Sequence, residues 1–227
     1  MIDKKNLVIA THNQGKLREF KELLIKSDCH IMAAKDFAIP EPNETGNTFI
    51  ANAELKTTTV KNWFLQHDKN NLPHFILADD SGIEITALHG APGIFSARWA
   101  GRDKNFNIAI ERVKQELLKK NIAPEKLMAP LLSANFSCAL SLFVSAQNKT
   151  LSVLGVANGF LKFPPSGHQG FGYDSIFVPQ PEMIGQKRTF ANMTTAEKDK
   201  ISHRTHALKL LLDVCQKENI DFTLPDF

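Results

Sequence analysis

The chain has 227 residues, of which 43% are hydrophobic and 22% charged, and its formal net charge is +3. These values are those of an ordinary globular protein that is long enough to bury a sizeable core. The small charge excess gives no support to nucleic-acid binding, and it does not oppose an anionic small ligand. The three cysteines lie far apart without a Cys-x-x-Cys pair, which weighs against a zinc site and indicates reduced thiols.

The first elements alternate between strand and helix. Residues 7–10 form an apolar run that predicts a short buried strand. The run is too short for a signal-peptide core or a membrane span, so we expect a cytoplasmic protein. A polar loop over 11–16 follows, and apolar residues at helical spacing predict a helix over 16–25. A second helix is expected to begin near Asn47 or Thr48 and to run towards residue 63.

Hairpins dominate the later part of the pattern. The sequence predicts a strand over 75–78 that stops at residues 79–82, a helix over 108–120, a loop over 124–130 and a strand over 136–144 with one wetter face. A hairpin partner over 151–156, a loop over 163–172 and a strand over 176–178 follow. A capping box of Thr194 and Glu197 begins a last helix that continues to about residue 217. Cys138 and Cys215 fall in apolar patterns and are expected in the core. The pattern as a whole indicates an α/β domain with a mixed sheet.

Residues 11–16 form a polar loop between a predicted strand and a predicted helix. Backbone N–H groups, a helix N-terminus and Lys16 are suited to an anion. The spacing is not that of a P-loop, because Ala10 and Leu17 stand where glycine and Ser or Thr are needed. The same residues also fit an ordinary strand-to-helix turn with a solvated lysine.

Acidic residues mark two further segments. The adjacent carboxylates of Asp79 and Asp80 repel each other unless a cation lies beside them, and their oxygens suit Mg²⁺. A polar turn is the alternative interpretation. Glu44 precedes the helix that carries Asn52 and Lys56, which are four residues apart on one helical face. Taken alone, Glu44 fits a favourable partner of the helix dipole.

Two late segments combine flexibility with polar groups. Residues 167–174 hold glycines, two aromatic residues and a carboxylate, so they suit either stacking on a ring-shaped ligand or ordinary packing of a loop. The polar residues that crowd the start of the last helix fit either a binding site or a solvated face: Lys198, Ser202, His203 and Arg204.

Together, these segments closely resemble the inosine triphosphate pyrophosphatase family, also called XTP/dITP diphosphatases. The matching stretches are residues 10–16, 44–49, 78–82, 90–98, 170–174 and 201–204, and they follow the family's order. The resemblance implies a single α/β domain over 1–227, with a long mixed β-sheet, flanking helices and two lobes around an active-site cleft. It further implies a homodimer that hydrolyses non-standard purine nucleoside triphosphates (dITP, ITP, XTP) to the monophosphate and pyrophosphate.

The resemblance also implies a role for each matching residue. Glu44, Asp79 and Asp80 would serve Mg²⁺, and Asp80 would be the general base for a water that attacks the α-phosphorus. The residues implied in substrate binding are Thr11, His12, Asn13, Gln14, Gly15, Lys16, Lys56, Ser81, Phe171, Gly172, Tyr173, Asp174, Lys198, His203 and Arg204. His12 stands where several relatives have a small residue, and the stretches near 66–73 and 120–132 look like surface insertions.

Three other functions are compatible with parts of the pattern. A Maf-type pyrophosphatase acts on modified pyrimidine nucleotides, but its basic signature is absent from this sequence. A non-catalytic nucleotide sensor has no need for the carboxylates of Glu44 and Asp80. A nucleic-acid-binding module is disfavoured by the modest charge. The sequence does not rank dITP, ITP and XTP as substrates.

Overall fold

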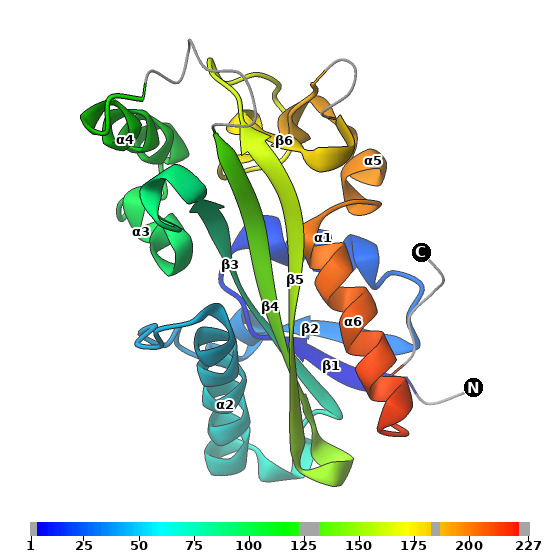
Figure 1. Ribbon diagram of the computed structural model, residues 1–227. Coiled ribbons are helices and arrows are strands. Elements are labelled where there is room, and N and C mark those ends of the chain that lie inside the picture. The colour runs from blue at the N-terminus through cyan, green and yellow to red at the C-terminus, as the bar shows by residue number, and fades with distance from the viewer. Residues whose placement is uncertain (1–3, 123–131, 183–186, 223–227) are drawn as a thin grey trace. The chain divides into compact units, whose positions relative to one another are not determined.

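The structure is a computed structural model that describes residues 4–122, 132–182 and 187–222. The chain forms two compact units (Figure 1). The first comprises Met1–Asp80, Cys138–Gly155 and Ala207–Phe227, and the second comprises Ser81–Ser137 and Val156–His206.

One mixed β-sheet contains all six strands found in the described residues, in the order β2-β1-β3-β4-β5-β6. Strand β1 pairs in parallel with both β2 and β3, whereas β5 pairs antiparallel with β6. The bounds are β1 Lys5–Ile9, β2 Cys29–Ala33, β3 Phe75–Ile85, β4 Ser133–Val144, β5 Lys149–Leu161 and β6 Phe177–Pro179. The longest three, β3, β4 and β5, each contribute residues to both units.

Six α-helices flank the strands of the described chain. They are α1 Gln14–Leu23, α2 Phe49–His67, α3 Ser96–Trp99, α4 Phe106–Lys119, α5 Thr195–Asp199 and α6 His203–Lys217. The side chain of Asn13 caps α1 by accepting from the N–H groups of Gly15 and Lys16, and Thr48 caps α2 by accepting from Ala51 N.

No helix within the described ranges has the length and apolar character needed to cross a membrane.

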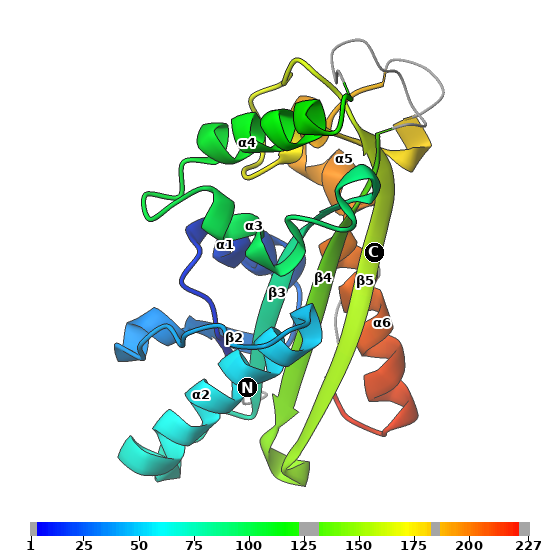
Figure 2. The same cartoon turned by 60° about the vertical axis from the view of Figure 1, so that its left-hand side comes forward.

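In the first unit, helices cover both faces of the strands. Side chains of α1 and α6, such as Phe20 and Leu208, pack with Leu7 and other residues on one face. Side chains of α2, such as Phe64, pack with Val8 on the other face. Figures 1 and 2 show α2 and α6 on opposite sides of the strands. Burial on both faces explains why these strands are continuous apolar runs.

The second unit has a core of its own. It gathers around the second half of β3 and the apolar side of α4, for example Ile83, Val113 and Leu117. Phe177 on β6 and the buried Tyr173 complete this core.

The predicted α/β class with a mixed sheet is confirmed, and most of the predicted strands and helices are present with end points that shift by a few residues. Strand β2 and the short helix α3 were not predicted. Cys138 and Cys215 are 0% and 1% exposed, as expected of core residues. The segment 66–73 contains the end of α2 and a short 3₁₀ turn over Lys69–Asn71. The loop expected over 124–130 lies outside the described residues, which resume at Leu132.

Three local predictions are wrong. Strand β3 does not stop at Asp79 but runs through to Ile85, because the backbone stays extended across the two carboxylates. Strand β4 has no wetter face, since Ser137 and Ser141 are only 1% and 0% exposed. The last helix is broken into α5 and α6. The hydroxyl of Ser202 accepts from Thr205 N–H at 3.1 Å, so this serine caps a new helix.

Candidate active site

Asp79 and Asp80 lie inside a strand, and this decides how their charges are held. Successive side chains of a strand point to opposite faces. Asp79 therefore faces α1 and Asp80 faces α2, as their contacts below show. Both are buried, at 1% and 5% exposure. Two adjacent carboxylates thus avoid facing each other, and each meets a lysine from a different helix.

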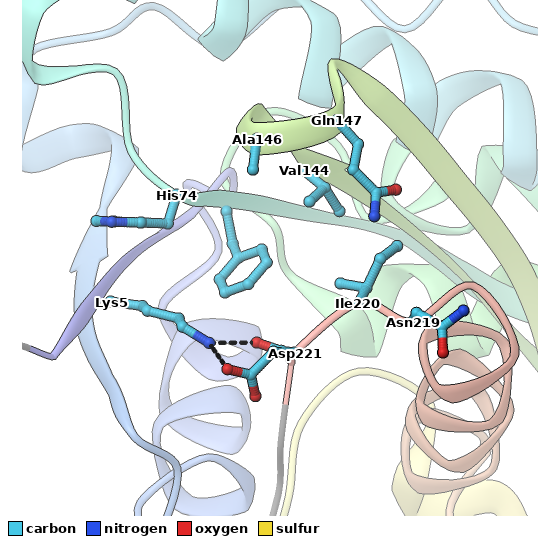
Figure 3. A pocket seen from close by; sticks show the side chains of 9 residues that line it. Lys5, His74, Val144, Ala146, Gln147, Asn219, Ile220 and Asp221 are labelled. Carbon is cyan, nitrogen blue, oxygen red and sulfur yellow. Dashed lines mark hydrogen bonds and ion pairs between the residues drawn. The ribbon is translucent and has the colours of Figure 1, made fainter.

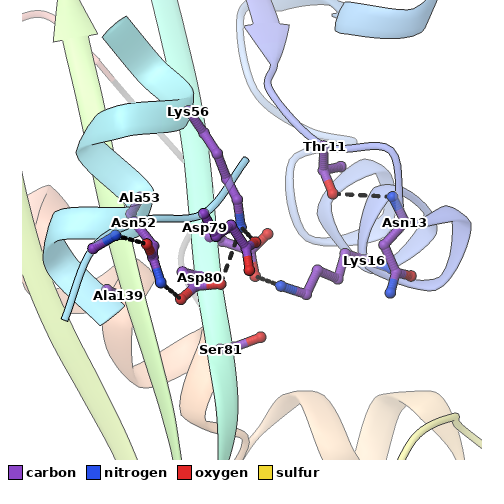
Figure 4. A network of polar contacts seen from close by, with 12 residues as sticks. Thr11, Asn13, Lys16, Asn52, Ala53, Lys56, Asp79, Asp80, Ser81 and Ala139 are labelled. Carbon is purple, nitrogen blue, oxygen red and sulfur yellow. Dashed lines mark hydrogen bonds and ion pairs between the residues drawn. The ribbon is translucent and has the colours of Figure 1, made fainter. Parts of the chain in front are cut away.

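Lys16, from the start of α1, meets Asp79. Its Nζ lies 2.9 Å from Asp79 Oδ2, and the carboxylate side chain is fully buried (Figure 4). The loop before α1 is held by its own polar groups, since Thr11 Oγ1 accepts from Asn13 N at 3.2 Å. This loop positions Lys16 while its polar side chains cap the helix.

His12 and Gln14 make contacts with the segment that follows β2. His12 Nε2 donates to the carbonyl of Ile39 at 2.9 Å, and Gln14 Oε1 accepts from Lys35 at 3.3 Å. In this structure His12 therefore holds a neighbouring segment, which gives a structural reason for its presence.

Lys56, on α2, joins several acidic groups. Its Nζ lies 2.6 Å from Glu44 Oε1 and 3.0 Å from Asp80 Oδ1, and it donates to the main-chain oxygen of Asp79 at 3.1 Å. Burial by itself lowers the pKa of Lys56, but the carboxylates of Asp80, Asp79 and Glu44 outweigh it and raise the pKa. Lys56 is therefore a fixed positive charge.

Asn52 is the functional residue that sequence reasoning left without a role. Its side chain is fully buried, and its Nδ2 donates to Asp80 Oδ2 at 3.1 Å. Its Oδ1 accepts from Gly46 N at 2.8 Å, and a Cβ at Gly46 would lie only 2.6 Å from that oxygen. Asn52 thus ties the loop carrying Glu44 to Asp80. Its spacing of four residues from Lys56 was the available signal.

The burial of Asp80 has an electrostatic consequence. Desolvation raises the pKa of its carboxyl, although Lys56 and Lys16 act in the opposite direction. A buried carboxylate of this kind is a stronger base than an exposed one.

The oxygens around Lys56 match the chemistry of a hard divalent cation. Two carboxylates, of Glu44 and Asp80, and one carbonyl oxygen, of Asp79, converge on a single ammonium group. Mg²⁺ takes few protein carboxylates and completes its shell with water and phosphate oxygens. The donor set therefore fits Mg²⁺. Within the described ranges, no group of three acidic, His or Cys side chains is arranged to hold a metal ion, and the carboxylates of Glu44, Asp79 and Asp80 are each paired with a lysine.

In the second unit, Asp174 holds the loop that contains Phe171. Its Oδ2 accepts from Phe171 N at 2.9 Å and pairs with Lys198 Nζ at 2.7 Å, both charged side chains being buried. Gly170 has a φ of +72°, and a Cβ there would lie 2.0 Å from the same carboxylate oxygen. Only glycine fits this approach. Lys198 Nζ also lies 5.2 Å from the centre of the Phe171 ring.

Tyr173 is turned inward. It is 2% exposed, and its hydroxyl donates to the main-chain oxygen of Ser96 at 3.0 Å. Its ring packs edge-on against Phe106. Tyr173 therefore anchors the loop.

His203 and Arg204 begin α6 and are both buried. The His203 ring stacks on Phe136, with centres 4.8 Å apart. Arg204 Nη2 donates to Ser81 Oγ at 3.4 Å. Because the helix is broken before His203, His203 and Arg204 lie in the first turn of α6 and do not continue α5.

The structure thus gathers the candidate residues into two groups, one in each unit. The first contains Thr11, Asn13, Lys16, Glu44, Asn52, Lys56, Asp79 and Asp80. The second contains Ser81, Phe171, Tyr173, Asp174, Lys198, His203 and Arg204. Ser81 follows Asp80 directly in β3, so the chain itself connects the groups.

A cavity of about 180 Å³ in the first unit is separate from these residues (Figure 3). Phe75, Val144 and Ile220 supply apolar lining, and the ion pair of Lys5 and Asp221 lies at its side. None of the predicted site residues lines it, so it is not the candidate active site.

Comparison with known proteins identifies a family that this chain resembles over most of its length. Residues 7–214 match the Ham1 family. A dITP/XTP pyrophosphatase from Rhodospirillum centenum is 44% identical over 209 residues, which are 92% of this chain and 94% of that protein. A dITP/XTP pyrophosphatase from Bacillus subtilis is 38% identical over 212 residues, which are 93% of this chain and 97% of that protein.

Two solved structures of Ham1 proteins are similar to this chain. A HAM1 protein from Coxiella burnetii matches with a TM-score of 0.74 at 33% identity, covering 94% of this chain and 99% of that one. The Staphylococcus aureus Ham1 protein matches with a TM-score of 0.73 at 32% identity, covering 94% and 100%. These similarities confirm the resemblance inferred from the motifs.

The role of Asn52 can be tested by stability. Asn52→Ala leaves the buried Asp80 oxygen and Gly46 N–H without this partner, so we expect the free energy of unfolding to fall by about 1–3 kcal/mol. Urea denaturation measures the change. Asn71→Ala is the matched control, because Asn71 makes its hydrogen bond to Asp68 at the exposed surface, and its effect should stay within about 0.5 kcal/mol. Equal effects of the two substitutions would contradict the bridging role.

Proposed function

The chain belongs to the Ham1 family, and from this premise we propose that it hydrolyses non-standard purine nucleoside triphosphates, namely dITP, ITP and XTP, to the nucleoside monophosphate and pyrophosphate. The names of its relatives support this reaction. The observation that carries the proposal is the buried Asp80 carboxylate, held by Lys56 and Asn52 beside a second lysine, Lys16.

This cluster suits a dense anion. A triphosphate repels an attacking nucleophile unless cationic groups neutralise it, so catalysis depends mainly on positioning and electrostatic stabilisation. Lys16 and Lys56 supply the positive charge, and the N-terminus of α1 after Asn13 supplies N–H groups. We assign contact with the triphosphate to residues 11–16 and to Lys56.

Asp80 is the general base in this proposal. Water oxygen forms a bond to the α-phosphorus, the bond from that phosphorus to the bridging oxygen breaks, and pyrophosphate leaves. Asp80 takes the proton that the water loses. A carboxylate has about four acceptor positions. Lys56 and Asn52 use one oxygen each, so acceptor capacity remains.

The same residues account for a metal requirement. We assign Mg²⁺ to the oxygens of Glu44 and Asp80 and the main-chain oxygen of Asp79, with the Asp79 carboxylate left to Lys16. When bound, Mg²⁺ neutralises charge on the phosphate oxygens.

The second group is assigned to the base and sugar. Phe171 offers a ring face for stacking, and Asp174 and Lys198 hold the loop in place. The nearby residues assigned to the same end of the substrate are Ser81, Gly172, His203 and Arg204. Tyr173 contributes by anchoring the loop.

Removal of the general base, Asp80, should nearly stop turnover and leave nucleotide binding intact. We expect Asp80→Asn to lower kcat by about 10²–10⁴-fold, the range typical of general-base catalysis, while nucleotide affinity survives. Steady-state kinetics and calorimetric binding test the two halves. Asp221→Asn removes a carboxylate that is paired with Lys5 outside the cluster, and it should leave kcat unchanged. Turnover of Asp80→Asn within a factor of a few of the parent would exclude Asp80 as the base.

Metal removal gives an independent check. EDTA should abolish hydrolysis, and added Mg²⁺ should restore it. Ca²⁺ should serve poorly, because it prefers longer bonds and more ligands. Activity is followed by pyrophosphate release. Full activity in excess chelator would refute the metal role of Glu44 and Asp80.

The substrate class is tested with a panel of nucleotides. Hypoxanthine and xanthine carry a 6-oxo group where adenine carries a 6-amino group. A pocket that donates a hydrogen bond to the 6-oxo group would place that donor against the amino group of ATP, where it has no acceptor. Such a mismatch costs roughly 1–3 kcal/mol. GTP must be rejected through its 2-amino group. We expect ITP, dITP and XTP to have the higher kcat/KM.

The products distinguish the reaction type. Incubation of ITP with the protein and Mg²⁺ should yield IMP and pyrophosphate, and not IDP and phosphate. Equal kcat/KM for ATP and ITP would favour a general nucleotide pyrophosphatase, and binding without turnover would favour a sensor.

A further inference from the structure

Lys56 occupies the point where the acidic oxygens of the first unit converge. Its Nζ lies 2.6 Å from Glu44 Oε1, 3.0 Å from Asp80 Oδ1 and 3.1 Å from the Asp79 main-chain oxygen. These three oxygens come from the loop before α2 and from β3. They are the donors that a hard divalent cation takes in proteins.

The ammonium group is well fixed at this point. Lys56 is 7% exposed, and it extends from the buried face of α2 (Figure 4). A cation is therefore already present among the oxygens, and it is a part of the chain.

An ammonium and a divalent ion cannot share these oxygens. Both need the same lone pairs, and like charges a few ångströms apart repel strongly in a buried place. The cluster has three carboxylates, of Glu44, Asp79 and Asp80, against two ammonium groups, of Lys16 and Lys56. Its excess is one negative charge, so a divalent ion added to it would leave the buried cluster with a net positive charge.

We propose that Lys56 is a built-in substitute for the metal, which holds the cation position in the nucleotide-free protein and leaves it when a triphosphate arrives. This inference rests on the proposed function. The phosphate oxygens supply the negative charge that the cluster lacks, so Lys56 turns to them and a divalent ion takes its place at Glu44 and Asp80. Metal binding then depends on substrate, and the carboxylates stay neutralised between turnovers.

The test is metal binding without nucleotide. Mn²⁺ is titrated into the full chain, and bound ion is measured by electron paramagnetic resonance. The parent should bind Mn²⁺ weakly. Lys56→Met removes the competing charge at similar volume, so we expect its dissociation constant for Mn²⁺ to fall by about tenfold or more.

Lys61→Met is the matched control. Lys61 lies on the same helix, but its Nζ contacts the side-chain oxygen of Asn148 at 2.8 Å at the exposed surface. The Lys61→Met variant loses the same charge from α2, but the lost group does not contact the carboxylates. Its affinity for Mn²⁺ should therefore equal that of the parent.

Lys56→Gln keeps the proposal testable should Lys56→Met fail to fold, because its amide can still donate to a carboxylate oxygen. It should also bind Mn²⁺ more tightly than the parent. Mn²⁺ should raise the Tm of either variant more than that of the parent.

An affinity for Mn²⁺ that is unchanged or weaker in the folded Lys56 variants would overturn the proposal and leave Lys56 a structural residue. Hydrolysis of ITP by the parent is measured separately. Its absence would refute the proposed function, whereas its presence together with unchanged Mn²⁺ binding would refute only the role of Lys56.

Discussion

The side-chain alternation of β3 is the constraint on which the candidate site depends. A strand sends Asp79 and Asp80 to opposite faces, so two adjacent carboxylates can both be buried without facing each other. Each then requires its own cation, because an unpaired buried charge is very costly. Lys16 from α1 and Lys56 from α2 meet this requirement. The strand thereby determines where α1 and α2 must each place a lysine.

The N-terminal caps of α1 and α2 fix the positions of these two lysines. Asn13 and Thr48 cap α1 and α2, so each helix begins at a defined residue. Lys16 lies in the first turn of α1, and Lys56 lies about two turns from the start of α2. Asn52 then links the loop before α2 to the carboxylate of Asp80. Loop, helix and strand form one hydrogen-bonded network, and such a network holds its members in a single arrangement only when all of them are satisfied.

In the second unit, a buried carboxylate that is paired with a lysine likewise holds a loop in place. Asp174 and Lys198 are a buried ion pair, and the carboxylate also accepts from the backbone of Phe171. Gly170 allows the backbone to approach that carboxylate, while Tyr173 ties the loop to Ser96. An aromatic ring on a glycine-rich loop is thus held by charge and by hydrogen bonds. In the proposed function, this positioning would serve stacking on a nucleotide base.

The sequence by itself determined the residue types of the site, the capping box of Thr194 and Glu197, the helical and strand periods, and a set of motifs specific enough to indicate the family. These are local properties, and short-range patterns carry them. Only the tertiary structure decided that β3 continues past Asp80, that Ser202 begins a new helix, and that Lys56 meets Asp80 from 24 residues away. Contacts at such separation depend on how whole elements pack, and no periodicity along the chain records which carboxylate a given lysine will reach.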